Sequence, residues 1–270
     1  MKITSKTKIC MVIGDPIAHS LSPQLHNAGY EALGIDDQFV YVACNVDVQK
    51  IEDFVNGIRA MNVRGVSCTI PHKIAVMPYL DEIDETAKKI GAVNTIINNE
   101  GVLKGYNTDW LGVVKPIEQL TAIENKTVAV IGAGGAARAA AYAIETKGGI
   151  VTIYNRTLEK AQIIAKEFSG EAYSLDQIEQ VSKADIIINT TSVGLHEKNK
   201  SIISKEYINS KQIIFDAVYG KEETQLIKDA KEQGAQIITG MEMLLQQGLA
   251  QFKLYTHQDP PVDVMRKVLL

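Results

Sequence analysis

The sequence has few cysteines, and their spacing matches no familiar framework. Cys10, Cys44 and Cys68 are odd in number and form no C-x-x-C motif. Small secreted domains and redox or zinc motifs use paired cysteines at characteristic spacings. We therefore expect three reduced thiols and a cytoplasmic protein.

Long apolar runs and a strong excess of either charge are also missing. No apolar run approaches the length of a membrane-spanning helix, and the run at 9–13 is too short for a signal-peptide core. The formal net charge of −4 over 270 residues gives no reason to expect a nucleic acid or a membrane as partner. With 46% hydrophobic and 22% charged residues, the chain has the composition of a soluble protein of one large or two smaller domains.

Metal-binding patterns are absent as well. The histidines show neither an H-E-x-x-H motif nor paired ligand spacing, so we expect them to be structural or exposed and the protein to bind no metal. They are His19, His26, His72, His196 and His257.

The most informative stretch that is present runs over 128–139. Four apolar residues at 128–131 predict a buried parallel strand, and the sequence G-A-G-G-A-A follows at 132–137. This order matches the G-x-G-x-x-G/A fingerprint, in which glycines let the backbone turn sharply beside a pyrophosphate at a helix N-terminus. The stretch predicts a dinucleotide site in a doubly wound parallel sheet.

The end of the next predicted strand, 150–154, indicates which dinucleotide binds. An NAD site normally places an acid there, next to the ribose 2′-hydroxyl. This chain instead has Asn155, followed by Arg156, Thr157 and Lys160. A guanidinium, a hydroxyl and an ammonium group bind a 2′-phosphate, which an acid would repel. We predict NADP; the alternative is a plain turn with solvated basic residues.

The remaining patterns alternate between strands and helices, which predicts two α/β domains. In the first part, a mixed sheet is expected from strands at 8–13, 39–43 and 66–70, helices at 22–34 and 47–61, and a hairpin at 93–106. Ser22 is expected to cap the helix that Pro23 begins. In the second part, strands at 185–189, 212–216 and 235–239 are expected, with helices at 110–120 and 222–234 and another after a capping box at 174–177. Helices at 241–257 and 262–269 lie beyond the last strand.

Polar residues follow several first-domain strands, where ligands bind in open α/β sheets. Lys73, on a short loop after a proline, could move a proton, and Asp109 could pair with it. Each also has a simpler interpretation: Ser22 as a helix cap, Lys73 as an exposed lysine and Asp109 as an N-terminal helix charge. The residues alone indicate an NADP-linked enzyme with a polar substrate. The candidates are Ser20, Ser22, Thr69, Lys73, Asn94 and Asp109.

Taken together, these blocks resemble the shikimate dehydrogenase family. The stretches 14–27, 65–73, 91–95 and 105–109 are similar to that family's first-domain motifs, in the same order. The resemblance covers nearly the whole chain. It is completed by the glycine stretch and by 155–157, 189–194, 216–219 and 240–248.

The resemblance implies an oxidoreductase that reduces 3-dehydroshikimate to shikimate with NADPH, on the route to chorismate and the aromatic amino acids. It implies Lys73 as the acid–base group and Asp109 as its hydrogen-bonded partner. Ser20, Ser22 and Tyr219 would hold the substrate carboxylate. The substrate hydroxyls would be bound by Thr69, Asn94, Asp109 and Gln247.

The same resemblance implies how the chain is divided. A substrate-binding catalytic domain would comprise 1–108 and 241–270, and an NADP-binding Rossmann domain 109–240, with the C-terminal helices returning to the first domain. The expected partners are a small-molecule substrate and NADP, in a monomer or homodimer. The cofactor-binding residues would be Gly132, Ala133, Gly134, Gly135 and Ala136 for the pyrophosphate, Asn155, Arg156, Thr157 and Lys160 for the adenosine end, and Ala217 and Gly240 beside the nicotinamide.

Three positions depart from the family pattern. Ser67 stands where Asn is usual, which could remove one substrate hydrogen bond or bridge it by water. Lys160 stands where Arg is common and offers a point charge in place of a fork. Tyr255-Thr256-His257 replaces Trp-Thr-Gly, with no chemical consequence that the sequence reveals.

Three rival functions remain. A quinate/shikimate dehydrogenase would use a broader substrate range or NAD, and would typically carry an acid near position 155. A non-catalytic NADP-sensing module would have lost the Lys73 and Asp109 pair, which is present. A methyltransferase using S-adenosylmethionine would also need an acid after the second strand.

Overall fold

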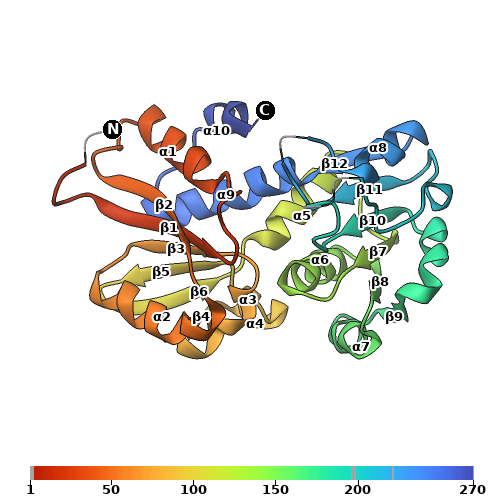
Figure 1. Ribbon diagram of the computed structural model, residues 1–270, viewed down its shortest axis with the longest axis horizontal. Helices are drawn as coiled ribbons and strands as arrows, with labels where there is room; N and C mark the ends of the chain where they lie inside the picture. Colours follow the sequence, from red (N-terminus) through yellow and green to blue (C-terminus); the bar gives the residue numbers. More distant parts are fainter. Residues whose placement is uncertain (1–2, 196, 198, 221, 270) are drawn as a thin grey trace. The chain divides into compact units, whose positions relative to one another are not determined.

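The computed structural model describes residues 3–195, 197, 199–220 and 222–269. The chain divides into two compact units, and each contains one six-stranded sheet (Figure 1). Unit 1 comprises the residues up to Thr108 and those from Leu244 onward, and unit 2 comprises Asp109–Met243. The second change of unit falls within the long helix α9 (Gly240–Thr256), a few residues after the position 240/241 expected from the sequence.

Unit 1 contains a mixed sheet with the strand order β2-β1-β3-β5-β6-β4. Its strands are β1 (Lys8–Gly14), β2 (Phe39–Asn45), β3 (Gly65–Cys68), β4 (Glu82–Ile83), β5 (Thr95–Asn99) and β6 (Val102–Tyr106). Its α-helices are α1 (Ser22–Ala32), α2 (Ile51–Ala60), α3 (His72–Ala75), α4 (Glu85–Ile90), the greater part of α9, and α10 (Val262–Leu269). β1 pairs in parallel with β2 and β3, whereas β5 is antiparallel to β3 and β6. The expected mixed sheet with a hairpin is confirmed; the short strand β4 was not expected.

Helices cover both faces of this sheet. Ile51, Val55 and Ile58 recur at helical spacing on α2 and pack on one face, with β3 and β6. The other face carries an aromatic cluster in which Tyr41 of β2 meets α1 and α9, and α10 packs against α1. The C-terminal helices therefore complete the core of unit 1.

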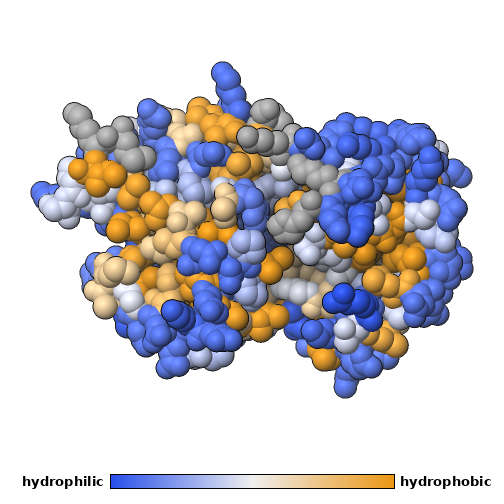
Figure 2. Space-filling model, in the orientation of Figure 1, coloured by the Kyte–Doolittle hydropathy of each residue, from blue (hydrophilic) through white to orange (hydrophobic). Residues whose placement is uncertain are grey.

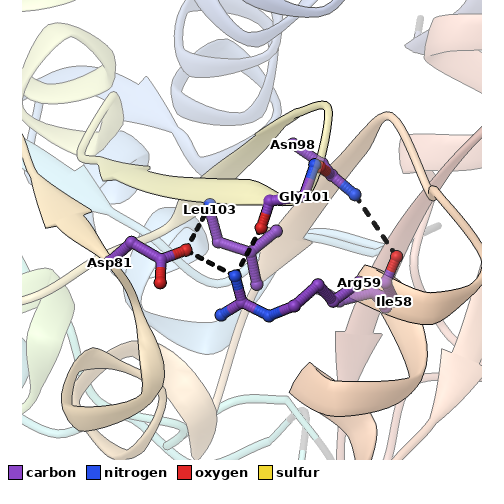
Figure 3. A network of polar contacts seen from close by, with 6 residues as sticks. All are labelled: Ile58, Arg59, Asp81, Asn98, Gly101 and Leu103. Atoms are coloured by element: carbon purple, nitrogen blue, oxygen red, sulfur yellow. Dashed lines mark hydrogen bonds and ion pairs between the residues drawn. The ribbon is translucent and has the colours of Figure 1, made fainter.

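The β5–β6 hairpin is fixed to α2 by a small polar network (Figure 3). Arg59 donates one hydrogen bond to Asp81 Oδ2 at 2.6 Å and another to the carbonyl of Gly101 in the turn. The same Asp81 oxygen accepts from the backbone N–H of Leu103 at 2.7 Å. The hydrogen bond from Arg59 is the main cause that lowers the pKa of Asp81. The carboxylate thus stays charged and holds helix and hairpin together.

Unit 2 contains an all-parallel sheet with the order β12-β11-β10-β7-β8-β9. Its strands are β7 (Thr127–Ile131), β8 (Ile150–Asn155), β9 (Glu171–Ser174), β10 (Ile186–Asn189), β11 (Ile213–Asp216) and β12 (Gln236–Thr239). Its α-helices, besides the start of α9, are α5 (Asp109–Glu118), α6 (Gly135–Thr146), α7 (Leu158–Glu167) and α8 (Gln225–Glu232). The strand order reverses between β7 and β10, as in a doubly wound fold. This confirms the predicted fold class.

The alternate residues of β7 show how the two faces are filled. Val128 and Val130 pack with α5, α6 and α7 on one face. Ala129 and Ile131 pack on the other face, with α8 and the 3₁₀ helix η3 (Leu175–Lys183). A strand buried on both faces reads as a continuous apolar run, which is why the sequence located it.

Of two local predictions about helix caps, one was wrong and one was only partly confirmed. Leu21, not Ser22, occupies the N-cap of α1; Ser22 is the first helical residue, and its N–H donates to Ser20 Oγ at 3.3 Å. Ser174 ends β9, a strand that was not expected, and occupies the N-cap of the next helix as predicted, but it makes no side-chain capping hydrogen bond. Its hydroxyl instead lies 3.4 Å from Asp176, and the following segment is the 3₁₀ helix η3.

Among the described residues, no helix has the length and apolar character needed to cross a bilayer. On the face shown in Figure 2, hydrophobic side chains lie scattered among hydrophilic ones. Scattered exposed hydrophobic side chains are normal for folded proteins and need no partner to explain them.

Candidate active site

The turn after β7 contains Gly132 and Gly134, which differ in the space that a Cβ would have. Gly132 has φ +119°, and a Cβ there would lie 2.5 Å from Thr190 Oγ1. Gly134 has an ordinary φ of −98°, and a Cβ there would meet nothing within 4 Å. Internal packing therefore requires glycine at 132 but not at 134. The open space at Gly134 fits close approach of a ligand to the backbone.

Helix α6 starts at this open space. Gly134 is its N-cap and makes no side-chain capping bond, and the first turn holds no acidic residue. The first N–H groups of a helix have no partner within it and carry the positive end of its dipole. Gly135 and Ala136 therefore belong to a structure suited to bind a phosphate group.

The turn after β8 is basic. Asn155 ends the strand, and its side-chain amide donates to the carbonyl of Thr157 at 2.8 Å, which shapes the turn. Arg156, Thr157 and Lys160 are exposed, so their polar groups can reach a bound ligand. With an amide at the position where an NAD site has a carboxylate, these groups fit a 2′-phosphate.

A buried network supports the loop after β11. Asp216 is 0% exposed; it accepts from Asn189 Nδ2 at 2.9 Å, from Thr224 Oγ1 at 2.5 Å and from the N–H of Val218 at 3.1 Å. Burial raises the pKa of Asp216, and these hydrogen bonds oppose the rise. The network fixes the backbone that carries Ala217 and the half-buried Tyr219.

Gly240 lies against the same loop. A Cβ there would be 2.5 Å from the carbonyl oxygen of Ala217 and 2.7 Å from that of Val218. A glycine at 240 thus allows the start of α9 to pack on the loop after β11.

In unit 1, the C-terminal edge of β3 gathers polar residues. The N–H of Thr69 donates to the carbonyl of Ile13 in β1, and that of Cys68 to the carbonyl of Asn94. The carbonyl of Lys73, in α3, accepts from the N–H of Val93 at 2.7 Å. Thr69, Lys73 and Asn94 are therefore brought to one edge of the sheet. Ser20 and Ser22 follow β1 at the same edge.

Asn94 is the most constrained residue of this edge. It is 2% exposed, and its Oδ1 accepts from the N–H of Thr108 at 2.8 Å and from Thr95 Oγ1 at 2.7 Å. Its Nδ2 donates to Thr108 Oγ1 at 2.9 Å and lies 3.4 Å from Oε1 of Gln247 in α9. The sequence predicted both Asn94 and Gln247 as site residues, and the structure brings these two together.

Asp109 and Tyr219 belong to unit 2. Asp109 is 3% exposed, is the first residue of α5, and directly follows Thr108 in the chain. Its backbone is therefore one residue from the hydrogen bond between Thr108 and Asn94.

The histidines form no metal site in the described part of the chain. No group of three or more His, Cys, Asp or Glu side chains there could hold a metal ion. His26 and His72 are buried, at 0% exposure, and burial lowers the pKa of both, that of His26 to about 3. His19 and His257 are exposed. His196 lies outside the described residues.

Sequence reasoning missed two buried residues beside Asn94. Gln251 Nε2 donates to Thr95 Oγ1 at 2.9 Å, and Thr95 in turn donates to Asn94. Gln251 lies one helical turn after Gln247 on α9, and that i, i+4 spacing could have indicated it.

Unit 2 thus combines a doubly wound sheet, a glycine turn and a basic ribose-side turn, and unit 1 offers a constrained polar edge with a lysine. These features place the protein in the class of NADP-dependent oxidoreductases with a separate substrate-binding unit. Three family models match the chain: a shikimate dehydrogenase substrate-binding domain over 12–96, shikimate / quinate 5-dehydrogenase over 116–218, and a shikimate 5′-dehydrogenase C-terminal domain over 240–270. The chain belongs to the shikimate dehydrogenase family.

Individual relatives agree with this assignment. A shikimate dehydrogenase (NADP(+)) of Methanothermobacter thermautotrophicus is 40% identical, covering 99% of this chain and 97% of the relative. The crystal structure of shikimate dehydrogenase from Aquifex aeolicus has a TM-score of 0.92 at 38% identity, covering 99% of both chains. The Thermus thermophilus enzyme, solved in complex with NADP(H) and shikimate, has a TM-score of 0.89 at 33% identity and covers 97% of this chain and 98% of its own.

Proposed function

We propose that this protein catalyses the reversible reduction of 3-dehydroshikimate to shikimate with NADPH, a step toward chorismate and the aromatic amino acids. The observation that carries the proposal is the edge of unit 1, where Asn94 and Gln247 present fixed polar groups close to the backbone of Lys73. A polyhydroxylated carboxylic acid needs several such groups at fixed positions, because each buried hydroxyl requires a partner.

The residues of unit 2 would hold the cofactor. Gly132 through Ala136 bind the pyrophosphate at the N-terminus of α6, and Asn155 through Lys160 bind the adenosine end. Ala217 and Gly240 lie at the nicotinamide side. When bound, NADPH supplies the hydride.

Lys73 would move the proton. Its ammonium group gives a proton to the carbonyl oxygen of 3-dehydroshikimate while the carbonyl carbon accepts the hydride. In the reverse reaction the neutral amine takes the proton back. Asp109 would pair with Lys73 and hold it in place.

The other residues would position the substrate. Ser20, Ser22 and Tyr219 bind its carboxylate through their hydroxyl groups. Thr69, Asn94, Asp109 and Gln247 bind its ring hydroxyls. Ser20 and Ser22 are suited to their role by the turn that joins them, in which the Ser22 N–H meets the Ser20 hydroxyl.

Four initial-rate assays test the function: shikimate or quinate as substrate, each with NADP or NAD. Shikimate with NADP should be oxidised far faster than quinate with NAD. Equal rates for these two pairs would instead favour a quinate/shikimate dehydrogenase. No turnover with any pair, together with retained NADP binding, would indicate a non-catalytic NADP-sensing module.

Lys73→Ala tests the proton transfer. General acid–base groups contribute about 10²- to 10⁴-fold, so kcat should fall by that factor while NADP still binds. Lys50→Ala, which removes an exposed lysine elsewhere in unit 1, is the matched control and should keep full activity. Full turnover in Lys73→Ala would remove the proposed mechanism.

We also propose a cytoplasmic location and a monomeric or homodimeric state. Cys10, Cys44 and Cys68 form no disulfide, which is compatible with a reducing compartment. Sedimentation velocity of the purified protein distinguishes one copy from two.

A further inference from the structure

A line of buried side chains links helix α9 to Asn94. Gln251 Nε2 donates to Thr95 Oγ1 at 2.9 Å, and Thr95 Oγ1 donates to Asn94 Oδ1 at 2.7 Å. Gln251, Thr95 and Asn94 are 1%, 0% and 2% exposed. Water cannot easily replace a partner at such burial, so the direction of each hydrogen bond is fixed by the protein.

The orientation of the Gln251 amide is set by a group that can only accept. Gln251 Nε2 also donates to the backbone carbonyl of Asn94 at 3.3 Å. The nitrogen end of the amide must therefore face Asn94 and Thr95, and the oxygen end must face away. Oε1 then accepts from the hydroxyl of Ser67 at 2.9 Å.

At the other end of this line of hydrogen bonds, Ser67 contacts two tyrosines. The hydroxyl of Tyr41 donates to Ser67 Oγ at 2.5 Å, and that of Tyr255 lies 2.7 Å from the same atom. A serine hydroxyl has one proton, and Ser67 gives it to Gln251. Tyr255 must therefore donate as well, so no hydrogen bond along the line can reverse without leaving another group unsatisfied.

This direction determines what Asn94 offers to a ligand. With the Gln251 N–H directed at its oxygen, Thr95 keeps its proton pointed at Asn94 Oδ1. That oxygen also accepts from the N–H of Thr108, so both of its lone pairs are used. Asn94 therefore donates through Nδ2: one N–H bonds to Thr108 Oγ1 at 2.9 Å, and Nδ2 also lies 3.4 Å from an acceptor, Gln247 Oε1.

Gln247 is held in the complementary orientation. Its Nε2 donates to the carbonyl of Leu244 at 2.8 Å, which turns Oε1 toward Asn94. A donor and an acceptor thus lie side by side. A substrate hydroxyl satisfies both, because it accepts from Asn94 and donates to Gln247, whereas a ketone or an ether satisfies only the donor.

We propose that Gln251 is a positioning residue that, through Thr95 and together with the Thr108 N–H, holds Asn94 as a hydrogen-bond donor and so makes the Asn94–Gln247 pair selective for a hydroxyl group. This inference rests on the proposed function, in which Asn94 and Gln247 bind a ring hydroxyl of shikimate. Gln251 itself would touch neither substrate nor cofactor.

Three variants test the line. Gln251→Met keeps length and burial but removes the three hydrogen bonds of the Gln251 amide, and Thr95→Val removes the hydroxyl that links Gln251 to Asn94. Each should raise KM for shikimate about tenfold, the worth of roughly one hydrogen bond, with kcat and KM for NADP within about twofold of wild type. Thr95→Ser restores the hydroxyl and should return KM to within about twofold of the wild-type value.

The double variant separates positioning from simple damage. Because Gln251 acts through Thr95 and the two side chains share a hydrogen bond, combining Gln251→Met with Thr95→Val should raise KM no more than either change alone. Thr256→Val, which removes another buried hydroxyl on α9, is the control and should leave KM for shikimate unchanged.

The outcomes distinguish this inference from the function on which it rests. Calorimetric titration with shikimate in the absence of cofactor gives the dissociation constant for each variant, independent of turnover. If wild type binds and oxidises shikimate but Gln251→Met binds it equally well, the positioning role is refuted and the function stands. Failure of Thr95→Ser to restore binding, or additive increases in the double variant, would also refute it. If wild type neither binds nor oxidises shikimate, both proposals fall.

Discussion

Replacing His26 should remove much of the acid sensitivity of unit 1. The ring is 0% exposed and stacks on Tyr41 with centroids 4.3 Å apart and an interplanar angle of 5°. Burial lowers the pKa of His26 from 6.5 to about 3, and an interaction with Gln251 opposes the shift. The folded protein therefore keeps the imidazole neutral over a range in which an unfolded chain protonates it.

The size of the effect follows from proton linkage. Between pH 6.5 and about 3 the unfolded state binds more protons at this residue than the folded state, so stability falls as pH falls. At pH 5 the unfolded imidazole is about 1.5 pH units below its pKa, which at about 1.36 kcal/mol per unit costs about 2 kcal/mol. His26→Phe keeps a ring but has no proton to bind. Between pH 8 and pH 5 it should lose about 2 kcal/mol less unfolding free energy than wild type.

The chain offers a separate probe for each unit. Its cysteines all lie in unit 1, and burial, the main cause, raises the pKa of Cys10 to about 12, so that the folded thiol is protected. Urea unfolding of unit 1 is followed by the labelling of Cys10 and Cys68 with dithiodipyridine, and that of unit 2 by the fluorescence of Trp110.

The comparison of variants decides the result. His19→Phe, which changes an exposed histidine, should retain the full acid sensitivity of wild type. If wild type and His26→Phe lose the same free energy in the cysteine-monitored transition between pH 8 and pH 5, the linkage argument is refuted.

Two further pairs of variants test unit 2. Gly134→Ala should leave the melting temperature unchanged, because a Cβ there meets no protein atom within 4 Å, but it should weaken NADP binding by filling the space that the cofactor needs. Gly240→Ala should lower the melting temperature, because a Cβ there would lie 2.5 Å from the Ala217 carbonyl oxygen. Differential scanning calorimetry and NADP titration of both variants check these expectations. Arg156→Ala should raise KM for NADP about 10- to 100-fold, as expected for loss of one or more charge-assisted hydrogen bonds, and should change KM for NAD little. Lys160→Ala should also raise KM for NADP, but by a smaller factor. Equal effects on the two cofactors would show that these side chains do not contact the 2′-phosphate.

The sequence predicted the parts of the fold whose signals are local. The strand over 128–131, the turn at Gly132 and the helix after it follow one another within a few residues, and each has a characteristic composition. The mixed sheet of unit 1 was predictable for the same reason, since its hairpin is marked by Asn98-Asn99-Glu100-Gly101 between two apolar runs. Helix capping was less predictable, because a serine before a proline is compatible with more than one start of the helix, as Ser22 shows.

The candidate site divides in the same way. Asn94 and Thr69 could be named because they lie near the ends of predicted strands, within the motifs at 91–95 and 65–73. Gln251 has only its spacing of one helical turn from Gln247 to indicate it. Its role could not be predicted, because its contacts with Ser67 and Thr95 join residues more than 150 positions apart and depend on how α9 packs on the sheet.

The departures at positions 67 and 255 become intelligible when the two are considered together. The hydroxyl of Ser67 is bound by Tyr41, Tyr255 and Gln251, so it is occupied within the protein and no substrate contact needs to be assigned to it. A tryptophan at 255 could not place a hydroxyl beside Ser67, because its single donor is the indole N–H. The two departures therefore form one hydrogen-bonded unit. In that unit, a serine of β3 is satisfied by two tyrosines and by Gln251 of α9.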